Sequence, residues 1–398
     1  MEKIKKILKA LGIYSLVINL YDSWVFKKEF KGLTTLIKQT DFDKSPIFFF
    51  PYYHTGGAEK VHLNIVSAIS DKQCFTFFSK TSYNNQFLDD FKKNSNVFLI
   101  TKFLKNPKSK QKLVQLLLNK LSKSSLVFGS NNEFFYEMVS QFNDDLKKID
   151  LLHAFVYPDN ENASEHYSLP VVDRLTTRIV INKKTEKDLF DQYAVNNVSS
   201  KLQNRISTIY NGVEIAKDVK DKSEDSILNV LYVGRNTQEK RVHLIARIAK
   251  ELEDFKDIKF RAIGADLAHF FSNSTNVLAT GVKQGGELEL EYQRANILLL
   301  TSKREGFPLV LSEAMTNNMA CISTAVGGIP FLLESDENCF LVNPENEDTI
   351  VAFMVEKLNL LRTDRSKLKM ITEKGRIKIN ETFAYDNFVK KYRDLLLK

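Results

Sequence analysis

The sequence predicts an α/β protein built from two doubly wound, Rossmann-like parallel sheets. Short apolar runs alternate along the chain with helical and loop segments, which is the order that a parallel sheet with helices on both faces requires. At 398 residues the chain is too long for one ordinary core. One polar stretch, Glu214 to Ser226, interrupts the alternation, and the pattern restarts after it. These observations indicate two domains joined near residue 220.

The first domain begins with a predicted strand at Ser45–Phe50. This run is short, apolar and aromatic, as expected of a strand buried on both faces. The glycine-rich turn Thr55–Gly57 leads from it into a helical pattern of apolar residues that continues to Ile69. Strand, turn and helix then repeat, and further strands are predicted at 73–78, 97–101, 126–129, 151–157 and 178–182.

The second domain begins with a predicted strand at Ile227–Val233. Further strands are predicted at 258–263, 277–280, 296–302 and 320–324, and helical sequence follows to the end of the chain. The chain therefore divides into a basic N-terminal extension at 1–45, a first Rossmann-like domain at 46–220, a second at 221–384 and a final helix at 385–398.

Cysteine usage and hydropathy indicate in which cellular compartment the protein works. Cys74, Cys321 and Cys339 are widely spaced and form no disulfide framework, which is typical of a reducing environment. The longest uncharged stretch near the N-terminus, Ala10 to Tyr21, is about half of what spans a bilayer, and no small-residue cleavage site follows it. We therefore expect a cytoplasmic protein with neither an export signal nor a transmembrane helix.

Positive charge is concentrated near the N-terminus. Residues 1–130 contain 21 Lys and Arg against 9 Asp and Glu, a net charge of +12, whereas the whole chain carries +8. Lysines at 3–9 and 102–123 interleave with leucine and isoleucine, so these segments could lie peripherally on the anionic inner face of the plasma membrane, where each lysine contributes on the order of 1 kcal/mol. The alternative is a solvated amphipathic helix. No nucleic-acid-binding motif accompanies the charge, and we expect no such partner.

Two glutamates eight positions apart, Glu305 and Glu313, mark the most informative segment of the chain. They follow the predicted strand 296–302, with Glu305 in the exit loop and Glu313 in the next helix. A rise of 1.5 Å per residue separates their depths by roughly 7 Å or more. One carboxylate could bind a sugar hydroxyl and the other a ribose. The alternative is a loop charge and a solvated helix residue.

The start of this helix suits an anion. Pro308 fits the first helical position, where a missing N–H has no cost. The amides of Leu309 and Val310 would then point out of the helix start, and such an end attracts phosphate.

Two cations, Arg235 and Lys240, follow Gly234 at the end of the first strand of the second domain. Ligands of open α/β sheets bind at the carboxyl ends of the strands. The two cations would therefore lie where a ligand binds. The alternative is a pair of surface charges next to Glu239.

Gly56 and Gly57 lie in the turn after the first strand, where glycine allows an oxyanion close to the backbone and a positive φ.

His153 ends an apolar run; it could line a ligand site or be a satisfied core histidine. His54 and Tyr157 are candidates for acceptor contacts. The six histidines show no metal-ligand spacing, so no metal is implied.

The segment Glu305 to Pro330 resembles the C-terminal signature of retaining glycosyltransferases of family 4, with their Glu-x7-Glu pair. The similarity continues through Ala314-Met315, the apolar run Ala320–Thr324 and the glycine-rich turn Val326–Pro330. Gly234-Arg235 with Lys240 resembles the Gly-Arg-x4-Lys element of this family. Gly56–Glu59 resembles its N-terminal Gly-Gly-Ala-Glu, and His153 matches its histidine beside the reacting carbon.

The resemblance implies the GT-B fold, with two Rossmann-like domains facing each other across a cleft and the final helix returning to the first domain. It implies that Glu305 binds donor-sugar hydroxyls, Glu313 binds the ribose, and Arg235 with Lys240 neutralises the diphosphate. The other donor-binding residues that it implies are Gly56, Gly57, Gly234, Phe307, Leu309 and Val310.

We therefore expect a metal-independent, retaining glycosyltransferase of the hexosyltransferase type. It would move a sugar from a nucleotide-diphosphate sugar, with UDP-sugar favoured over GDP-sugar, to a hydroxyl of a glycan or lipid-linked glycan in cell-surface polysaccharide or glycoconjugate biosynthesis. No cofactor beyond this substrate is expected. The alternatives are a non-catalytic glycan- or membrane-binding subunit and a sugar-nucleotide epimerase or phosphorylase of the same fold.

Overall fold

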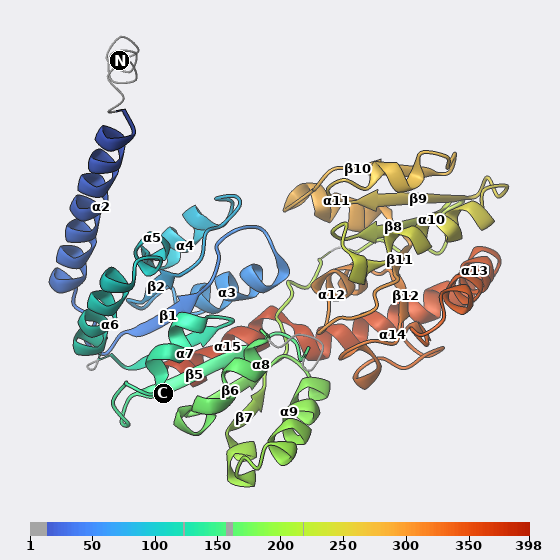
Figure 1. The fold of residues 1–398 in the computed structure, drawn as a ribbon. Helices are drawn as coiled ribbons and strands as arrows, with labels where there is room; N and C mark the ends of the chain where they lie inside the picture. Colours follow the sequence, from blue (N-terminus) through green and yellow to red (C-terminus); the bar gives the residue numbers. More distant parts are fainter. Residues whose placement is uncertain (1–13, 122–123, 157–161, 218) are drawn as a thin grey trace. The chain divides into compact units, whose positions relative to one another are not determined.

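The computed structural model describes residues 14–121, 124–156, 162–217 and 219–398 (Figure 1). Within these ranges the chain forms one sheet of seven strands and one of six, so the predicted pair of Rossmann-like α/β sheets is confirmed. The chain divides into two compact units. The first contains Met1–Thr55, Ile69–Asp150 and Ser168–Thr176, and the second contains Gly56–Ala68, Leu151–Tyr167 and Thr177–Lys398.

The seven-stranded sheet has the order β3-β2-β1-β4-β5-β6-β7. Its strand β1 (Pro46–Phe50) pairs in parallel with β2 (Phe75–Phe78) and β4 (Leu126–Ser130). All five residues of β1 are buried, as expected of an interior strand covered on both faces. The remaining strands are β3 (Asn96–Leu99), β5 (Lys147–Leu152), β6 (Thr177–Val180) and β7 (Ile206–Thr208).

The position of β5 differs from its prediction. The sequence predicts a strand at 151–157, whereas β5 starts at Lys147 and ends at Leu152. Two lysines hide its start, because a buried cation inside a strand is rare. Lys148 is nevertheless buried, and its Nζ donates to the backbone oxygens of Asn143 at 2.6 Å and Leu146 at 3.1 Å.

The helices of this half follow the strands as predicted. α3 (Gly57–Ser67) follows β1, and α7 (Glu133–Val139) and α9 (Lys183–Val195) start at asparagine caps. The Asn132 side chain accepts from the amide of Phe135 at 3.0 Å, which satisfies one donor at the helix start. The other helices are α4 (Leu88–Asn94), α5 (Thr101–Leu104), α6 (Pro107–Leu121) and α8 (Ser164–Tyr167).

The six-stranded sheet has the order β10-β9-β8-β11-β12-β13. Its strands are β8 (Leu228–Val233), β9 (Ile258–Ile263), β10 (Val277–Thr280), β11 (Ile297–Leu300), β12 (Ala320–Thr324) and β13 (Phe340–Val342). Its helices are α10 (Val242–Glu251), α11 (Gly286–Arg294), α12 (Leu309–Thr316), α13 (Glu347–Thr363) and α14 (Arg365–Phe383). The predicted domain boundary near residue 220 falls between β7 and β8.

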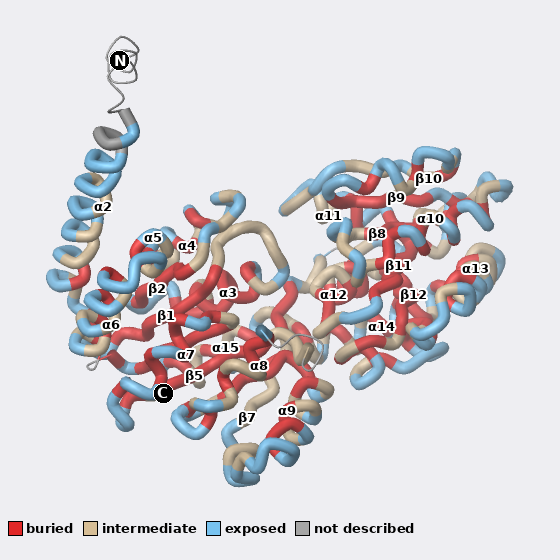
Figure 2. Tube along the Cα trace, viewed as in Figure 1, coloured by how far each residue is buried: buried red, intermediate tan, exposed pale blue. Residues whose placement is uncertain are grey.

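The first and last described helices, α2 and α15, do not connect strands: α2 comes before the first strand and α15 comes after the last one. α2 (Tyr14–Gln39) packs along α6 and is exposed over most of its length (Figure 2). None of the described helices is long and apolar enough to cross a bilayer. α15 (Tyr385–Leu397) contacts α3, and Arg393 donates to the carbonyl of Ala68 at 2.8 Å.

Candidate functional site

The six-stranded sheet has a topological switch point between β8 and β11. The chain leaves β8 toward β9 and β10 on one side and returns to β11 on the other side. In open α/β sheets, ligands bind outside the carboxyl ends of the strands at such a point. The loops after these two strands carry the predicted cations and the first predicted glutamate.

Lys240 and Glu305 form an ion pair at this switch point. Lys240 Nζ lies 2.5 Å from Glu305 Oε1, and the hydroxyl of Ser302 donates to the same oxygen at 2.6 Å. The side chains of Lys240 and Glu305 are only 20% and 10% exposed. The carboxylate is thus held in one position by two donors and keeps accepting capacity on its second oxygen.

Arg241 joins the two loops behind this pair. Its guanidinium donates to the carbonyls of Thr301 at 2.7 Å and Ser302 at 3.0 Å, and it is 7% exposed. Thr301 Oγ1 donates in return to the carbonyls of Lys240 and Arg241, at 2.9 and 3.1 Å. Arg241 has a φ of 48°, which ends the turn Gln238–Lys240 and starts α10. These bonds fix the Lys240 backbone relative to the end of β11.

Glycines allow the Glu305 loop to pack against other backbone. Gly327 has a φ of 57°, and a Cβ on it would lie 1.8 Å from the Glu305 carbonyl oxygen. The amide of Gly328 donates to the Gly306 carbonyl at 2.7 Å. A Cβ on Gly306 would lie 2.5 Å from the carbonyl oxygen of His153. The predicted glycine-rich turn therefore supports the Glu305 loop directly.

Glu313 has a partner that the sequence did not reveal. The hydroxyl of Tyr292, on α11, donates to Glu313 Oε2 at 2.7 Å. Burial raises the pKa of Glu313, and this hydrogen bond and the charge of Lys60 oppose the rise. Burial also raises the pKa of Tyr292 well above its ordinary value, so its hydroxyl stays a donor.

The helix that carries Glu313 starts one residue later than predicted. Pro308 is the N-cap, with ψ of 127°, and α12 begins at Leu309. Leu309 and Val310 are half-buried in its first turn. Phe307 is 4% exposed and stacks on Phe383 at a centroid distance of 4.5 Å, so it would serve a ligand through its backbone.

The N-terminal glycine turn has a different local role from the one predicted. Gly56 is extended, with φ of −176°, and Gly57 opens α3, so neither needs the positive φ that the sequence suggests. A Cβ on Gly56 would instead lie 2.1 Å from Glu59 Oε2. The Glu59 carboxylate folds back over Gly56, so a side chain at this position would displace the carboxylate. Burial raises the pKa of Glu59.

His153 pairs with a second histidine, His62, on α3. The two Nε2 atoms are 2.9 Å apart, and the rings meet edge to face. His62 is fully buried, and burial lowers the pKa of His153 to about 4 and that of His62 well below its ordinary value. Two neutral imidazoles can share one hydrogen bond, in which one ring donates and the other accepts. Sequence reasoning missed His62 because a helical histidine carries no signal of this contact.

The remaining predicted residues are more scattered. Arg235 is 74% exposed at its side chain and lies 4.0 Å from Glu239, outside the Lys240–Glu305 pair. A Cβ on Gly234 would meet the Tyr232 hydroxyl at 2.5 Å. In the first unit, His54 stacks on Tyr83, with the two ring centroids 3.9 Å apart.

Tyr157 lies outside the described residues. In the part of the chain that the structure describes, no group of three or more His, Cys, Asp or Glu could hold a metal ion.

Comparison with known proteins is consistent with this arrangement. The family described as glycosyl transferases group 1 matches residues 214–378, a range that contains Arg235, Lys240, Glu305 and Glu313. Sulfoquinovosyl transferase SQD2 of Arabidopsis thaliana is 31% identical over 163 residues, which are 39% of this chain and 30% of that protein. Trehalose synthase of Pyrococcus horikoshii is 25% identical over 278 residues, 67% of this chain and 61% of that protein. The chain spans less than two thirds of the length of these curated relatives.

Solved structures share the fold over most of the chain. HepE of Anabaena, crystallised in complex with UDP, has a TM-score of 0.70 at 15% identity and covers 89% of this chain and 99% of its own. The lipopolysaccharide outer core galactosyltransferase WaaB has a TM-score of 0.65 at 19% identity, over 88% of this chain and 99% of its own. The fold is therefore that of the GT-B glycosyltransferases. The narrower assignment to family 4 stays a prediction.

Proposed function

We propose that this chain is a retaining glycosyltransferase that moves a sugar from a nucleotide-diphosphate sugar to a hydroxyl of a glycan or lipid-linked glycan. The observation that carries the proposal is the Lys240–Glu305 pair at the switch point of the six-stranded sheet. The match of residues 214–378 to glycosyl transferases group 1 supports it. The crystal structures of HepE in complex with UDP and with UDP-glucose support a uridine donor.

Different residues of the second unit would bind different parts of the nucleotide-sugar donor. Lys240, with Arg235 from the same loop, would face the diphosphate, and the amides of Leu309 and Val310 would add donors at the start of α12. Glu305 would accept from hydroxyls of the sugar, and Glu313 from a ribose hydroxyl. The Tyr292 bond leaves accepting positions on the Glu313 carboxylate for that purpose.

The reaction follows from where charge develops. The bond between the anomeric carbon and the phosphate oxygen breaks, and its electron pair stays on the diphosphate, where Lys240 and Arg235 stabilise it. The acceptor oxygen bonds to the same face of the anomeric carbon, and its proton passes to the leaving phosphate. This front-side course needs no protein nucleophile and keeps the anomeric configuration. It also needs no metal, because protein cations neutralise the phosphates.

The proposal is tested by incubating the protein with UDP-glucose or another UDP-sugar and following UDP release with and without EDTA. We expect slow UDP release in water, faster release with a glycan acceptor, and no loss with EDTA. Proton NMR of the product should show the anomeric configuration of the donor. Inversion would contradict the retaining mechanism, and loss of activity with EDTA would contradict metal independence.

Variants in the two loops of the switch point provide the matched control. Lys240→Ala should lower the rate of UDP release at least about 100-fold, the range seen when one charge-stabilising group is removed. Lys303→Ala removes the same charge from an exposed position nearby and should leave the rate unchanged. Equal effects of both variants would mean that the Lys240–Glu305 pair is structural.

The setting of the reaction is part of the same proposal. We place it in the cytoplasm, in the biosynthesis of a cell-surface polysaccharide or glycoconjugate. Relatives named for such roles include the putative colanic acid biosynthesis glycosyltransferase WcaL of Escherichia coli, 27% identical over 177 residues. A non-catalytic subunit of the same fold is less compatible with this chain, because Arg235, Lys240, Glu305 and Glu313 are all present.

A further inference from the structure

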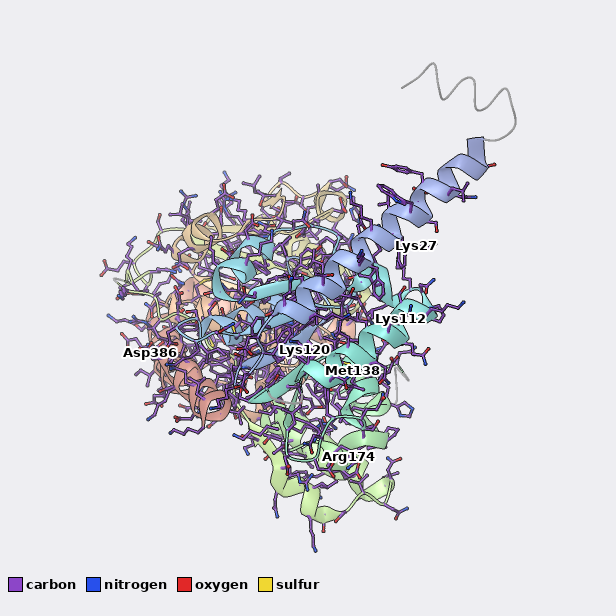
Figure 3. The ribbon with its side chains drawn as sticks, turned by 90° about the vertical axis from the view of Figure 1, so that its left-hand side faces the viewer. Lys27, Lys112, Lys120, Met138, Arg174 and Asp386 are labelled. Atoms are coloured by element: carbon purple, nitrogen blue, oxygen red, sulfur yellow. The ribbon has the colours of Figure 1, made fainter. Side chains whose placement is uncertain are left out.

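α2 and α6 form a groove lined by lysines in the first unit. It has a volume of about 620 Å³, and its lining contains the cations Lys27, Lys31, Lys38, Lys108 and Lys112 and no acid. Figure 3 shows Lys27 on α2 and Lys112 and Lys120 on α6. Lys120 links the two helices, because its Nζ donates to the Lys38 carbonyl at 2.8 Å. The transfer reaction proposed above uses none of these residues.

Helical spacing puts three of the four lysines of α2, Lys27, Lys31 and Lys38, on one face. Residues 20, 24, 27, 31 and 38 are separated by four, three, four and seven positions, which keeps them within one stripe of an α-helix. The two acids of the described helix, Asp22 and Glu29, fall on the opposite side. Glu29 is paired there with Lys102. The groove face is therefore uniformly positive.

Leu20 and Trp24 extend the same stripe toward the N-terminus of α2, and Tyr21 lies about 100° around the helix from Leu20. Leu20, Tyr21 and Trp24 are 63%, 60% and 57% exposed. Tyr21 and Trp24 are neighbours, with ring centroids 6.2 Å apart, and Lys28 Nζ lies 5.2 Å from the Trp24 ring centroid. The N-terminal part of α2 extends past the end of α6 (Figures 1 and 3), so α6 does not cover these side chains.

Lysines beside an exposed tryptophan on one helix face, with a tyrosine next to that tryptophan, suit the boundary of a lipid bilayer. Aromatic rings with a polar edge favour the headgroup region, and lysines are attracted to anionic headgroups. We propose that this face of α2 and α6 docks on the anionic surface of a bilayer, with headgroup phosphates in the lysine groove and Tyr21 and Trp24 in the interface. A soluble polyanion would match the lysines but would leave the aromatic side chains unexplained.

Trp24 is the single tryptophan of the chain, so its fluorescence reports on this face without any substitution. Vesicles of phosphatidylcholine with 30% phosphatidylglycerol, a composition chosen on the order of cellular anionic content, should shift its emission to the blue at low salt. Pure phosphatidylcholine vesicles should not, and raising the salt should reverse the shift, because exposed charges are screened. The same samples should show co-sedimentation of the protein.

Neutralising three lysines tests the groove. The variant Lys27→Gln/Lys31→Gln/Lys112→Gln should weaken partitioning onto anionic vesicles about 100-fold, since each lysine contributes on the order of a factor of five. The control Lys201→Gln/Lys256→Gln/Lys259→Gln removes the same charge from exposed positions elsewhere and should bind like the wild type. Circular dichroism should be unchanged in both variants.

Three outcomes would overturn the proposal. The first is no binding of the wild type to anionic vesicles at low salt. The second is equal weakening by both triple variants, which would indicate net charge alone. The third is tight binding of inorganic polyphosphate with no shift of Trp24 emission on vesicles, which would assign the groove to a soluble polyanion. Because lipid binding is measured without donor or acceptor, none of these results depends on the transfer activity.

Discussion

At the scale of single residues, Glu313 has an unusual environment for a carboxylate. Burial raises its pKa, so the folded chain holds a proton at a pH where the unfolded chain has lost it. The free energy of unfolding contributed by this group therefore falls as the pH rises from the ordinary glutamate pKa, about 4.3, through the raised value. Such a loss of folding stability is expected where a buried carboxylate is kept for ligand binding.

We predict that Glu313→Gln is more stable than the wild type at pH 7 but binds the donor nucleotide about 10 to 100 times more weakly, because a hydrogen bond to a charged group is lost. Urea unfolding at pH 7 and at pH 4 measures the first part, and the stability difference should close at the lower pH. Glu287→Gln, on the first turn of α11, is the control. Destabilisation of Glu313→Gln at pH 7 would contradict the account.

His62 is predicted to act as a positioning residue for His153. His62→Phe removes the hydrogen bond at 2.9 Å that orients His153, which the family resemblance puts beside the reacting carbon. It should therefore lower kcat about tenfold to 100-fold with little change in the KM for the donor. His62→Gln can still bond to His153 Nε2 and should restore part of the rate.

A pH profile separates this role from a packing role. Because burial lowers the pKa of both histidines, neither should titrate near 6.5, and ring NMR of the wild type should show both neutral at pH 6. A kcat that falls with an apparent pKa near 6.5 in the wild type would contradict the neutral pair.

At the scale of elements, a buried lysine holds together the helices that carry Tyr292 and Glu313. Lys222 is 3% exposed, and its Nζ donates to the carbonyls of Tyr292, Ala295 and Asn317, each at 2.7 Å. These carbonyls lie at the C-terminal ends of α11 and α12, where helix carbonyls lack internal partners and a cation is favoured. The segment before β8 thereby fixes the two helix ends.

Lys222→Met should lower the free energy of unfolding by about 3 kcal/mol or more, because three buried carbonyls lose their donor. Burial lowers the pKa of Lys222 to about 7 from 10.5, so between these values the unfolded chain binds more protons and the stability of the wild type rises with pH. The deficit of Lys222→Met should therefore be larger at pH 9 than at pH 6 in urea unfolding. Lys220→Met, two positions away on the surface, is the control; an equal deficit in both would refute the account.

Most elements could be predicted because apolar runs such as Ile297–Leu300 carry a strong local signal. β7 and β13 were missed, since strands of three residues have no periodicity to detect. Glu305, Lys240 and Glu313 could be selected from their spacing and from the family resemblance. Tyr292, His62 and Lys222 could not, because their contacts depend on residues 21 to 95 positions away that only the folded chain brings together.

At the scale of the whole molecule, the two compact units would have separate tasks. The second unit contains the Lys240–Glu305 pair, Glu313 and the histidine pair, which together would bind and activate a nucleotide sugar. The first unit contains the lysine groove of α2 and α6, which would hold the protein at a bilayer. Variants of one task should therefore leave the other unchanged, because the two sets of residues belong to different compact units.

In the proposed function, the switch point of the six-stranded sheet binds a nucleotide diphosphate. The most direct test is the thermal unfolding of the wild type, Lys240→Ala, Arg235→Ala and Lys303→Ala with UDP, GDP and ADP. A ligand at 100 times its Kd adds about 2.7 kcal/mol to the stability of the folded state. We predict that UDP raises the Tm of the wild type and of Lys303→Ala but hardly that of Lys240→Ala or Arg235→Ala. If no nucleotide raises the wild-type Tm, or if UDP raises the Tm of all four proteins equally, the claim is wrong.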